Sequence, residues 1–330
     1  MTGYIPPYRI TDKTLNLVAL ISEKIGRLTQ HGNLDSKPHL RKNNKIKSIH
    51  SSLAIEANSL SLGEVKDVIN GKLVLGAERE IQEVKNAYAA YEEISRLDVY
   101  DLEQLKRLHG IMTKYVTEKS GEFRLDEEGV FNGEKCIFMA PPAKFVPTLM
   151  EDLFNWMKKN KNTVHPLILS CVFHYEFVFI HPFTDGNGRM ARLWHTAILS
   201  KWQPIFEFIP IESQIEKFQS GYYDAIAKCH SDGSSTAFIE FMLEQINAVI
   251  DESARAVASP GGSVSKYVSR LLSAMEYDVP YTSNEILALL GLKSKETLRK
   301  NYLLPALKSN LIAMTEPDKP KSRNQRYIKK

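Results

Sequence analysis

The segment HPFTDGNGRMAR, residues 181–192, places very different chemical groups within twelve residues. It holds one imidazole, one carboxylate, two glycines around an asparagine, and two arginines three residues apart. The apolar residues that follow recur at helical spacing, namely Met190, Leu193, Trp194, Ala197 and Ile198. The segment therefore predicts a turn that leads into a helix. Packing of a protein core does not require such a mixture of polar and charged groups, so we interpret the segment as a candidate active site.

The start of the predicted helix suits a phosphate group. Gly186 and Gly188 let the backbone approach a ligand closely. Free N–H groups and the helix dipole favour an anion at Gly188 and Arg189. Because Arg189 and Arg192 are three residues apart, they project from nearly the same helix face. Two guanidinium groups one turn apart suit successive phosphates of a polyphosphate.

The remaining groups suit a transfer reaction. Asp185 supplies one carboxylate, which is enough for Mg²⁺ when phosphates and waters complete its coordination. His181 has an ordinary pKa of about 6.5 and can accept a proton near neutral pH. The residues thus favour transfer from a magnesium nucleotide to a hydroxyl group. The sequence has no GxxxxGK[ST] motif and no HRD–DFG pair, which excludes P-loop enzymes and protein kinases of the usual type.

Composition sets the outer bounds. The chain has 330 residues, of which 43% are hydrophobic and 25% charged, as in a globular protein of about two domains. The N-terminus lacks a signal peptide pattern, and the most apolar stretch, residues 166–180, is too short to span a membrane. Three dispersed cysteines, Cys136, Cys171 and Cys229, predict reduced thiols in a cytoplasmic protein without a zinc site.

Helical periodicity dominates the first 255 residues, and one segment departs from it. Apolar residues predict helices over 11–28, 78–97, 109–116, 145–159 and 166–180. By contrast, EEGVFNGEKCIFMAPP, residues 127–142, places Asn132-Gly133 between β-prone residues. An Asn-Gly pair in that setting predicts a hairpin.

The C-terminal segment has its own pattern. VASPGGSVS, residues 257–265, predicts a linker. A helix, a helix-turn-helix with its turn at Gly291, and a strand–loop–strand follow, which is the order of a winged helix. Residues 291–330 carry eleven Lys/Arg against three Asp/Glu, so their charge is +8 and the rest of the chain sums to −4. The candidate DNA-binding residues are Lys295, Arg299, Lys300, Arg323 and Arg326.

The motif HxFxDGNGRxxR is complete in residues 181–192 and resembles the signature of the Fic family. The resemblance covers roughly residues 1–255 and includes SSLAIEANSLSLGEV, GAEREIQEVKNAYAAY and the GEFR…NGEKCIFMAPPAKFVP region. It implies a mainly α fold, with a Fic-type helical bundle and a β-hairpin flap; the small winged-helix domain predicted from the pattern of the C-terminal segment follows them. It also implies transfer of AMP from ATP, since most characterised Fic proteins do this.

The resemblance assigns roles to individual residues. His181 would deprotonate a Ser, Thr or Tyr hydroxyl of a target protein, and Asp185 would hold Mg²⁺. Gly186, Asn187, Gly188 and Arg189 would cradle the phosphates, and Arg192 would pair with the γ-phosphate. Tyr222 and Tyr223 lie in a stretch similar to the family's aromatic segment near the adenine, although core packing explains them almost as well. The flap would hold the target segment by backbone pairing through Val130, Phe131, Cys136, Ile137 and Phe138.

A second motif resembles the family's self-inhibitory helix, [S/T]xxxE[G/N]. Ser52 and Glu56 fit it, but Ala57 stands where Gly or Asn is usual. Alanine suits a helix, so we expect the helix to form. By the resemblance, Glu56 would pair with Arg192 and suppress the reaction. Since this segment precedes the catalytic motif, the arrangement resembles class II of the family.

The sequence thus predicts four segments: an N-terminal helical region with the inhibitory motif (1–95), a Fic core (96–256), the linker (257–265) and a winged-helix domain (266–330). The leading hypothesis is a self-inhibited protein adenylyltransferase. One alternative is a hydrolase that removes AMP at the same site. Another is a DNA-binding regulator whose Fic part senses nucleotide. A homodimer is one open alternative for the oligomeric state, and no membrane association is expected.

Overall fold

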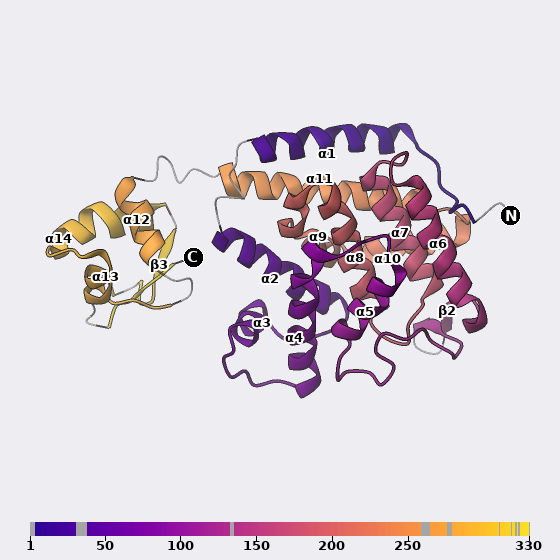
Figure 1. Ribbon diagram of the computed structural model, residues 1–330. Coiled ribbons are helices and arrows are strands. Elements are labelled where there is room, and N and C mark those ends of the chain that lie inside the picture. Colours follow the sequence, from indigo (N-terminus) through magenta and orange to yellow (C-terminus); the bar gives the residue numbers. More distant parts are fainter. Residues whose placement is uncertain are drawn as a thin grey trace. The chain divides into compact units, whose positions relative to one another are not determined.

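The computed structural model describes residues 4–30, 38–132, 135–258, 265–275, 279–309, 311–317, 319–320, 322 and 324–329. The chain forms two compact units, Met1–Ala254 and Arg255–Lys330, and helices dominate both (Figure 1). The predicted mainly α fold is therefore confirmed. Both sides of the predicted boundary at residue 95 belong to the first unit. Of the predicted linker, residues 257 and 258 lie in a helix and 259–264 lie outside the described residues.

The first unit is built from helices of very different length. They are α1 (Asp12–Gln30), α2 (Pro38–Ile55), α3 (Leu62–Ile69), α4 (Glu78–Glu92), α5 (Leu102–Met112), α6 (Val146–Asn160), α7 (Pro166–Ile180), α8 (Asn187–Trp202), α9 (Ile211–Lys217), α10 (Gln219–Asp232) and α11 (Thr236–Ala258). Short 3₁₀ helices are η1 (Ile94–Arg96), η2 (Ala143–Phe145) and η3 (Pro204–Phe208). The helix predicted over 109–116 ends earlier, at Met112, because the capping residue Thr113 leaves the helical conformation with a φ of −113° and a ψ of 8°.

The centre of this unit is the pair α7 and α8. Almost every residue of α7 is buried, which explains why its sequence is apolar on all sides rather than on one stripe. The helix begins with Pro166 after the capping residue His165, and it ends at His181, which adopts a left-handed conformation. Most of α8 is buried as well, and the two helices pack against each other. Residues 181–186 therefore form a short turn held between two rigid helices.

Helix α2 brings the N-terminal region to this turn. It packs against α9, α4 and α8, and its buried face includes Ile46, Ile49, Leu53 and Ile55. The packing against α8 explains how two motifs more than a hundred residues apart in sequence can meet.

The predicted hairpin is present. Strands β1 (Gly129–Asn132) and β2 (Lys135–Met139) pair antiparallel, with a register shift between Val130 and Phe131. Gly133, the second residue of the predicted turn, lies outside the described residues. The two strands form a sheet by themselves, so each has an edge that is not paired within that sheet.

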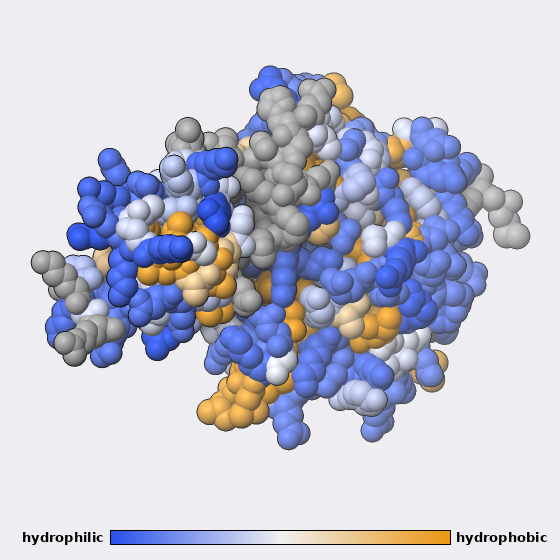
Figure 2. Space-filling model, turned by 60° about the vertical axis from the view of Figure 1, so that its left-hand side comes forward, coloured by the Kyte–Doolittle hydropathy of each residue, from blue (hydrophilic) through white to orange (hydrophobic). Residues whose placement is uncertain are grey.

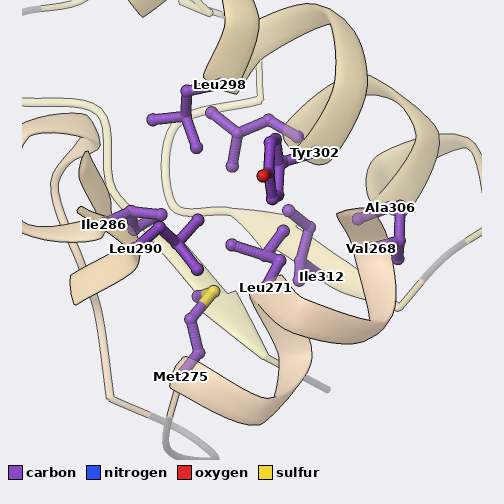
Figure 3. Packing of buried hydrophobic residues seen from close by; sticks show 10 residues of the cluster. Val268, Leu271, Met275, Ile286, Leu290, Leu298, Tyr302, Ala306 and Ile312 are labelled. Carbon is purple, nitrogen blue, oxygen red and sulfur yellow. The ribbon is translucent and has the colours of Figure 1, made fainter. Parts of the chain in front are cut away.

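The second unit contains helices α12 (Lys266–Ala274), α13 (Ser283–Leu290), α14 (Lys295–Thr297) and α15 (Leu304–Lys308), the π-helical segment η4 (Leu298–Leu303), and the antiparallel strands β3 (Ile312–Met314) and β4 (Tyr327–Lys329). Gly291 ends α13 with a φ of 62°, as the predicted turn requires. The elements follow in the predicted order, while a winged helix itself stays a prediction. The apolar core of the second unit lies between its helices and β3 (Figure 3). It comprises Val268, Leu271, Met275, Ile286, Leu290, Leu298, Tyr302, Leu303, Ala306 and Ile312.

The surface in Figure 2 is largely hydrophilic, with separate hydrophobic groups. Among the exposed apolar side chains, Leu73 and Leu75 are 95% and 89% exposed in the loop between α3 and α4. Within the part of the chain that the structure describes, no helix has the length and apolar character to cross a membrane.

Candidate active site

The turn between α7 and α8 has an unusual backbone. His181 has a φ of 52° and a ψ of 60°, and its N–H donates to the carbonyl of Phe177 at 2.9 Å. Gly186 has a φ of 82°, and a Cβ there would lie 3.0 Å from Cγ2 of Thr113. A left-handed non-glycine residue is uncommon and often marks a functional position. The turn thus holds His181 in a conformation that the surrounding structure must impose.

The imidazole of His181 is mostly shielded. Burial lowers the pKa of His181 below its ordinary value; a hydrogen bond with the backbone of Val178 and the charge of Glu56 oppose this effect, and Arg124 adds to it. The ring is therefore neutral at pH 7 and can accept a proton.

His181 lines a pocket of about 290 Å³. The polar part of the lining comes from the residue after α2, the turn and α8, and comprises Glu56, His181, Asn187, Gly188 and Arg192. The apolar part comes from β2, α7 and α10, and includes Phe138, Val178, Tyr223, Ile226 and Ala227. A pocket with both kinds of lining suits a ligand with a charged part and a flat apolar part.

Gly188 lies in the first turn of α8, where backbone N–H groups have no partner within the helix. The carboxylate of Glu56 comes so close that a Cβ on Gly188 would collide with its Oε1. An anionic group thus already lies where the sequence predicts a phosphate.

Arg192 is the main partner of this carboxylate. Its Nη2 lies 2.8 Å from Oε1 of Glu56 and also donates to the carbonyl of Ser52 at 2.8 Å. Its Nε donates to the Ser52 hydroxyl at 3.0 Å. The side chain of Arg192 is only 1% exposed, whereas that of Glu56 is 38% exposed. Burial alone would lower the pKa of Arg192, but Glu56 and neighbouring tyrosines raise it above its ordinary value.

The end of α2 explains how Glu56 reaches this position. The N–H of Asn58 donates to the carbonyl of Leu53, and that of Ala57 donates to the carbonyl of Ala54. These bonds form a Schellman motif, in which the residue after the cap turns left-handed. That residue is Ala57, with a φ of 65°. The expected helix is present as α2, but it ends before Ala57, which occupies a left-handed position that favours glycine or asparagine.

We predict that Ala57→Gly stabilises the protein by roughly 0.5–1 kcal/mol, because glycine adopts the left-handed conformation without the cost that a Cβ imposes. The matched control is Ala54→Gly three residues earlier, inside α2, which should destabilise by a similar amount. Thermal unfolding of both variants measures the effect. A lower midpoint for Ala57→Gly than for the parent would contradict the proposed strain at this position.

Asp185 is engaged by two arginines. Its Oδ1 lies 2.8 Å from Nη2 of Arg189, and its Oδ2 lies 3.0 Å from Nη2 of Arg79. The side chain of Asp185 is 33% exposed and that of Arg79 is 63% exposed. The Asp185–Arg79 contact is thus a surface ion pair, which a bound cation could replace. Among the described residues, no three His, Cys, Asp or Glu side chains gather as a metal site.

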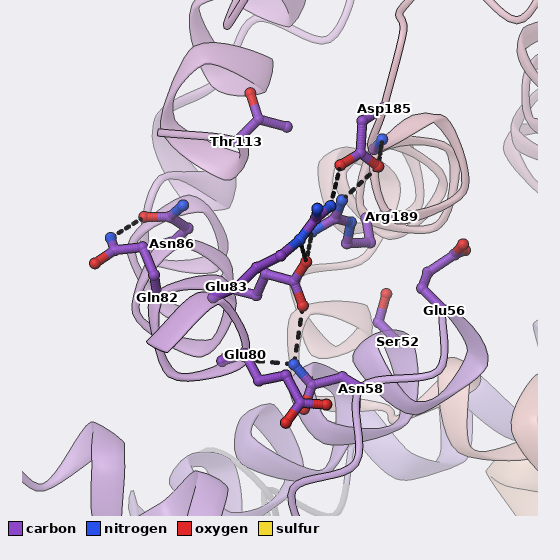
Figure 4. A network of polar contacts seen from close by, with 12 residues as sticks. Ser52, Glu56, Asn58, Glu80, Gln82, Glu83, Asn86, Thr113, Asp185 and Arg189 are labelled. Carbon is purple, nitrogen blue, oxygen red and sulfur yellow. Dashed lines mark hydrogen bonds and ion pairs between the residues drawn. The ribbon is translucent and has the colours of Figure 1, made fainter. Parts of the chain in front are cut away.

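A polar network joins this carboxylate to the α2 segment (Figure 4). Arg189 lies 3.4 Å from Oε1 of Glu83 on α4. Glu83 in turn accepts from Nδ2 of Asn58 at 2.9 Å. Arg189 therefore faces Asp185 and Glu83 and does not line the pocket. The network ties the residues just after Glu56 to the same turn that Glu56 contacts through Arg192.

The other residues predicted to bind the nucleotide differ in their burial and contacts. The side chain of Asn187 closes the turn: it accepts from the N–H of Phe183 and donates to the carbonyl of Phe183. Tyr222 is buried, and its hydroxyl lies 2.9 Å from Nε2 of His174. Tyr223 is 48% exposed. Both tyrosines line the pocket, so the structure brings them to the predicted site.

Of the predicted flap residues, Phe138 can be placed in full. Its ring stacks on His230 of α10, with centroids 4.0 Å apart, and both residues line the pocket. The backbones of Val130, Phe131, Cys136 and Ile137 lie in β1 and β2, and their side chains lie outside the described part.

In the second unit, Lys295, Arg299, Lys300 and Arg326 are exposed. Lys300 forms an ion pair with Glu296 at 3.1 Å. Arg323 lies outside the described residues.

Sequence reasoning missed the residues that hold the turn from outside. His109 of α5 accepts from the N–H of Gly121 at Nδ1, so its Nε2 carries the proton and donates to the carbonyl of Asp185 at 2.9 Å. Burial lowers the pKa of His109 to about 4, so its ring stays neutral. The ring also stacks on Phe183, with centroids 3.6 Å apart. No local pattern marks His109, because its partners are distant in sequence.

Comparison with known proteins agrees with the motif. The Fic/DOC family model matches residues 97–199. The model described as filamentation induced by cAMP protein Fic-like, C-terminal domain, matches residues 266–328.

Two named relatives match nearly two thirds of the chain. The protein adenylyltransferase fic-1 of Caenorhabditis elegans is 28% identical over 63% of this chain and 44% of its own length. The protein adenylyltransferase Fic of Culex quinquefasciatus is 26% identical over 62% of this chain and 41% of its own length. The chain thus spans less than half the length of these relatives.

A solved structure matches over almost the whole length. The crystal structure of a Fic family protein from Desulfovibrio desulfuricans G20 is 42% identical, with a TM-score of 0.76, and the match covers 99% of this chain and 98% of that one. Such identity over both chains exceeds what a shared fold alone requires. The chain belongs to the Fic family.

Proposed function

We propose that the protein transfers AMP from ATP to a Ser, Thr or Tyr hydroxyl of a target protein. The observation that carries the proposal is the single pocket in which His181, the start of α8 at Gly188, and Arg192 meet an apolar lining. The apolar lining suits an adenine ring, and the start of α8 suits its phosphates. The names of the two relatives support the same reaction.

In this reaction the target hydroxyl oxygen attacks the α-phosphorus, and its proton passes to the neutral imidazole of His181. The bond between the α-phosphorus and the oxygen that bridges to the β-phosphorus breaks, and pyrophosphate leaves. The N–H groups at Gly188 and the guanidinium of Arg192 would stabilise the charge on the phosphates. The unpaired edges of β1 and β2 would hold the target chain by backbone hydrogen bonds.

Mg²⁺ fits this site as a cation held chiefly by phosphate oxygens and water. Asp185 would be its one protein ligand, after exchange of the exposed Arg79 contact. The cation would neutralise charge on the leaving pyrophosphate. His109, through the carbonyl of Asp185, fixes the backbone that carries this ligand.

We further propose that the described arrangement is an inhibited state. Glu56 contacts Arg192 and crowds Gly188, so it would compete with the terminal phosphate of ATP for both. ATP could then bind only with its α-phosphate displaced from His181. Release of Glu56 would be needed for transfer.

The test uses the Glu56→Gly variant and two forms of radiolabelled ATP. Label at the α-phosphate should remain on protein after denaturation, and label at the γ-phosphate should leave as pyrophosphate. Label retained only from the γ-position would indicate a kinase instead. Absence of retained label from either form would remove the proposal.

Removal of AMP is a second candidate at the same site, favoured by the position of Glu56 beside His181 in one pocket. A carboxylate there could orient a water toward a phosphodiester. Protein labelled by Glu56→Gly is purified and mixed with unlabelled parent protein. Release of AMP that depends on Glu56 would favour the hydrolase, and stable label would favour transfer alone.

DNA binding by the second unit is a candidate function of another class, favoured by the exposed cations Lys295, Arg299, Lys300 and Arg326. We predict that the full chain binds a labelled duplex with an affinity that falls steeply as salt rises. Replacing Arg299 and Lys300 by Gln should lower the slope of log affinity against log salt by about two.

Fluorescence anisotropy over a salt series measures this slope. The matched control replaces Lys158 and Lys159 of α6, which are exposed cations in the first unit, and should leave the slope unchanged. No binding even at low salt would favour a protein partner for this unit.

A further inference from the structure

Arg124 lies in the loop between α5 and β1 and is only 1% exposed. Among the described ion pairs, none includes Arg124. Its charge is instead met by backbone carbonyl groups. A buried guanidinium requires such partners, because an unpaired charge in the interior is costly. The identity of these carbonyls shows what the residue connects.

One set of partners is the end of α7. The Nε of Arg124 donates to the carbonyl of His181 at 2.7 Å, and Nη2 lies 3.4 Å from the carbonyl of Ile180. The backbone N–H of Arg124 donates to the carbonyl of Pro182 at 2.9 Å. Arg124 therefore contacts three consecutive carbonyls, where the dipole of α7 places partial negative charge. These contacts help impose the left-handed backbone of His181.

The other set of partners is the base of the hairpin. Nη1 donates to the carbonyl of Asp126 at 2.8 Å, and Nη2 donates to the carbonyl of Pro141. Asp126 precedes β1 and Pro141 follows β2, so one guanidinium contacts both connections of the hairpin. The N–H of Ala140 also donates to the carbonyl of Glu128 at 3.0 Å, which closes the base between them.

We propose that Arg124 is a positioning residue that fixes the hairpin against His181, so that a target segment held by the hairpin meets the imidazole in a reactive geometry. The inference rests on the proposed function. Loss of Arg124 should impair transfer while leaving nucleotide binding nearly intact, because its hydrogen bonds go to carbonyls of the turn and of the hairpin base. They do not go to the Gly188 backbone or to Arg192, which would hold the phosphates.

The variants Arg124→Gln and Arg124→Lys are compared in the Glu56→Gly parent. We expect Arg124→Gln to lower the rate of self-labelling from α-labelled ATP at least tenfold, with the KM for ATP within twofold of the parent. Arg124→Lys should lie between, since an ammonium keeps the charge but cannot span both sets of carbonyls. The matched control is Arg107→Gln, which removes a half-exposed arginine paired with Glu93 and should leave the rate unchanged.

Hydrogen exchange supplies a readout that needs no activity. In Arg124→Gln, the amides of β1, β2 and residues 181–188 should exchange faster together, while those of α12 and α13 should not change. If Glu56→Gly itself takes no label from ATP, the proposed function fails, and exchange alone decides the role of Arg124. Parental labelling, a loss confined to the KM for ATP, or unchanged exchange at the hairpin and the turn would each overturn the inference.

Discussion

His181→Ala in the Glu56→Gly protein is expected to lower AMP transfer by roughly a hundredfold to ten-thousandfold, the usual contribution of a general base. ATP binding should persist, because the Gly188 backbone and Arg192 do not use the imidazole. Transfer is followed as protein-bound label from α-labelled ATP, and binding is followed by calorimetry with a non-hydrolysable analogue. Transfer at the parental rate would contradict the assignment of His181, and loss of binding would show that the substitution had damaged the pocket.

The pKa of His181 predicts how the rate of transfer depends on pH if this residue is the base. Burial lowers this pKa, so the neutral ring persists below the ordinary value of about 6.5. Since the base must be unprotonated, transfer should stay level from pH 8 down to about pH 6.5 and decline only as the pH falls through the lowered value. A rate that rises as the pH falls would require another group as the base.

The centre of the candidate site could be predicted from the sequence because its groups are contiguous. Residues 181–192 place the candidate base, the carboxylate and the helix start in the turn between α7 and α8 and in the first residues of α8. The hairpin was predictable for a similar local reason, since an Asn-Gly pair between β-prone residues has few other uses. The pairing of Glu56 with Arg192 came only from the family motif, because no local pattern links residues so far apart.

The supporting residues could not be read from the sequence. Arg124 and His109 act through backbone carbonyls of a turn 57 and 76 residues away. Carbonyls are present at every position, so no residue type in the turn signals such partners. Glu83 reads as one of many charged residues on a helix until the fold places it between Asn58 and Arg189.

The conformation of Ala57 could not be predicted from its residue type. Its residue type suits a helix, and only the bonds from Asn58 to Leu53 and from Ala57 to Ala54 reveal a left-handed position. The usual Gly or Asn at this place in the motif was the signal, since both residues tolerate positive φ. The strain at Ala57 lies directly beside Glu56, so it weakens the segment that would hold the inhibiting carboxylate. In the parent protein, Ala57→Gly should therefore lower residual transfer.

Glu56→Gly is expected to raise AMP transfer at least tenfold, or about 1.4 kcal/mol in the barrier. The carboxylate now bonds a buried guanidinium and crowds Gly188, so its removal frees both groups for the terminal phosphate. The partial exposure of Glu56 limits the strength of the pair, but the burial of Arg192 reduces screening by solvent on one side. A single charge-assisted hydrogen bond of this kind can contribute a free energy of the size that a tenfold change in rate requires.

Four proteins test whether both residues act through one contact: the parent, Glu56→Gly, Arg192→Ala and the double variant. The double variant should lose most of the gain, because Glu56 has no guanidinium to withhold once Arg192 is absent. Glu78→Gly on the exposed start of α4 is the matched control for loss of a carboxylate and should leave labelling unchanged. Self-labelling from α-labelled ATP is measured in all five. Equal labelling in the parent and Glu56→Gly would end the inhibition hypothesis, whereas a gain that survives Arg192→Ala would show that Glu56 acts by crowding Gly188 rather than by occupying the arginine.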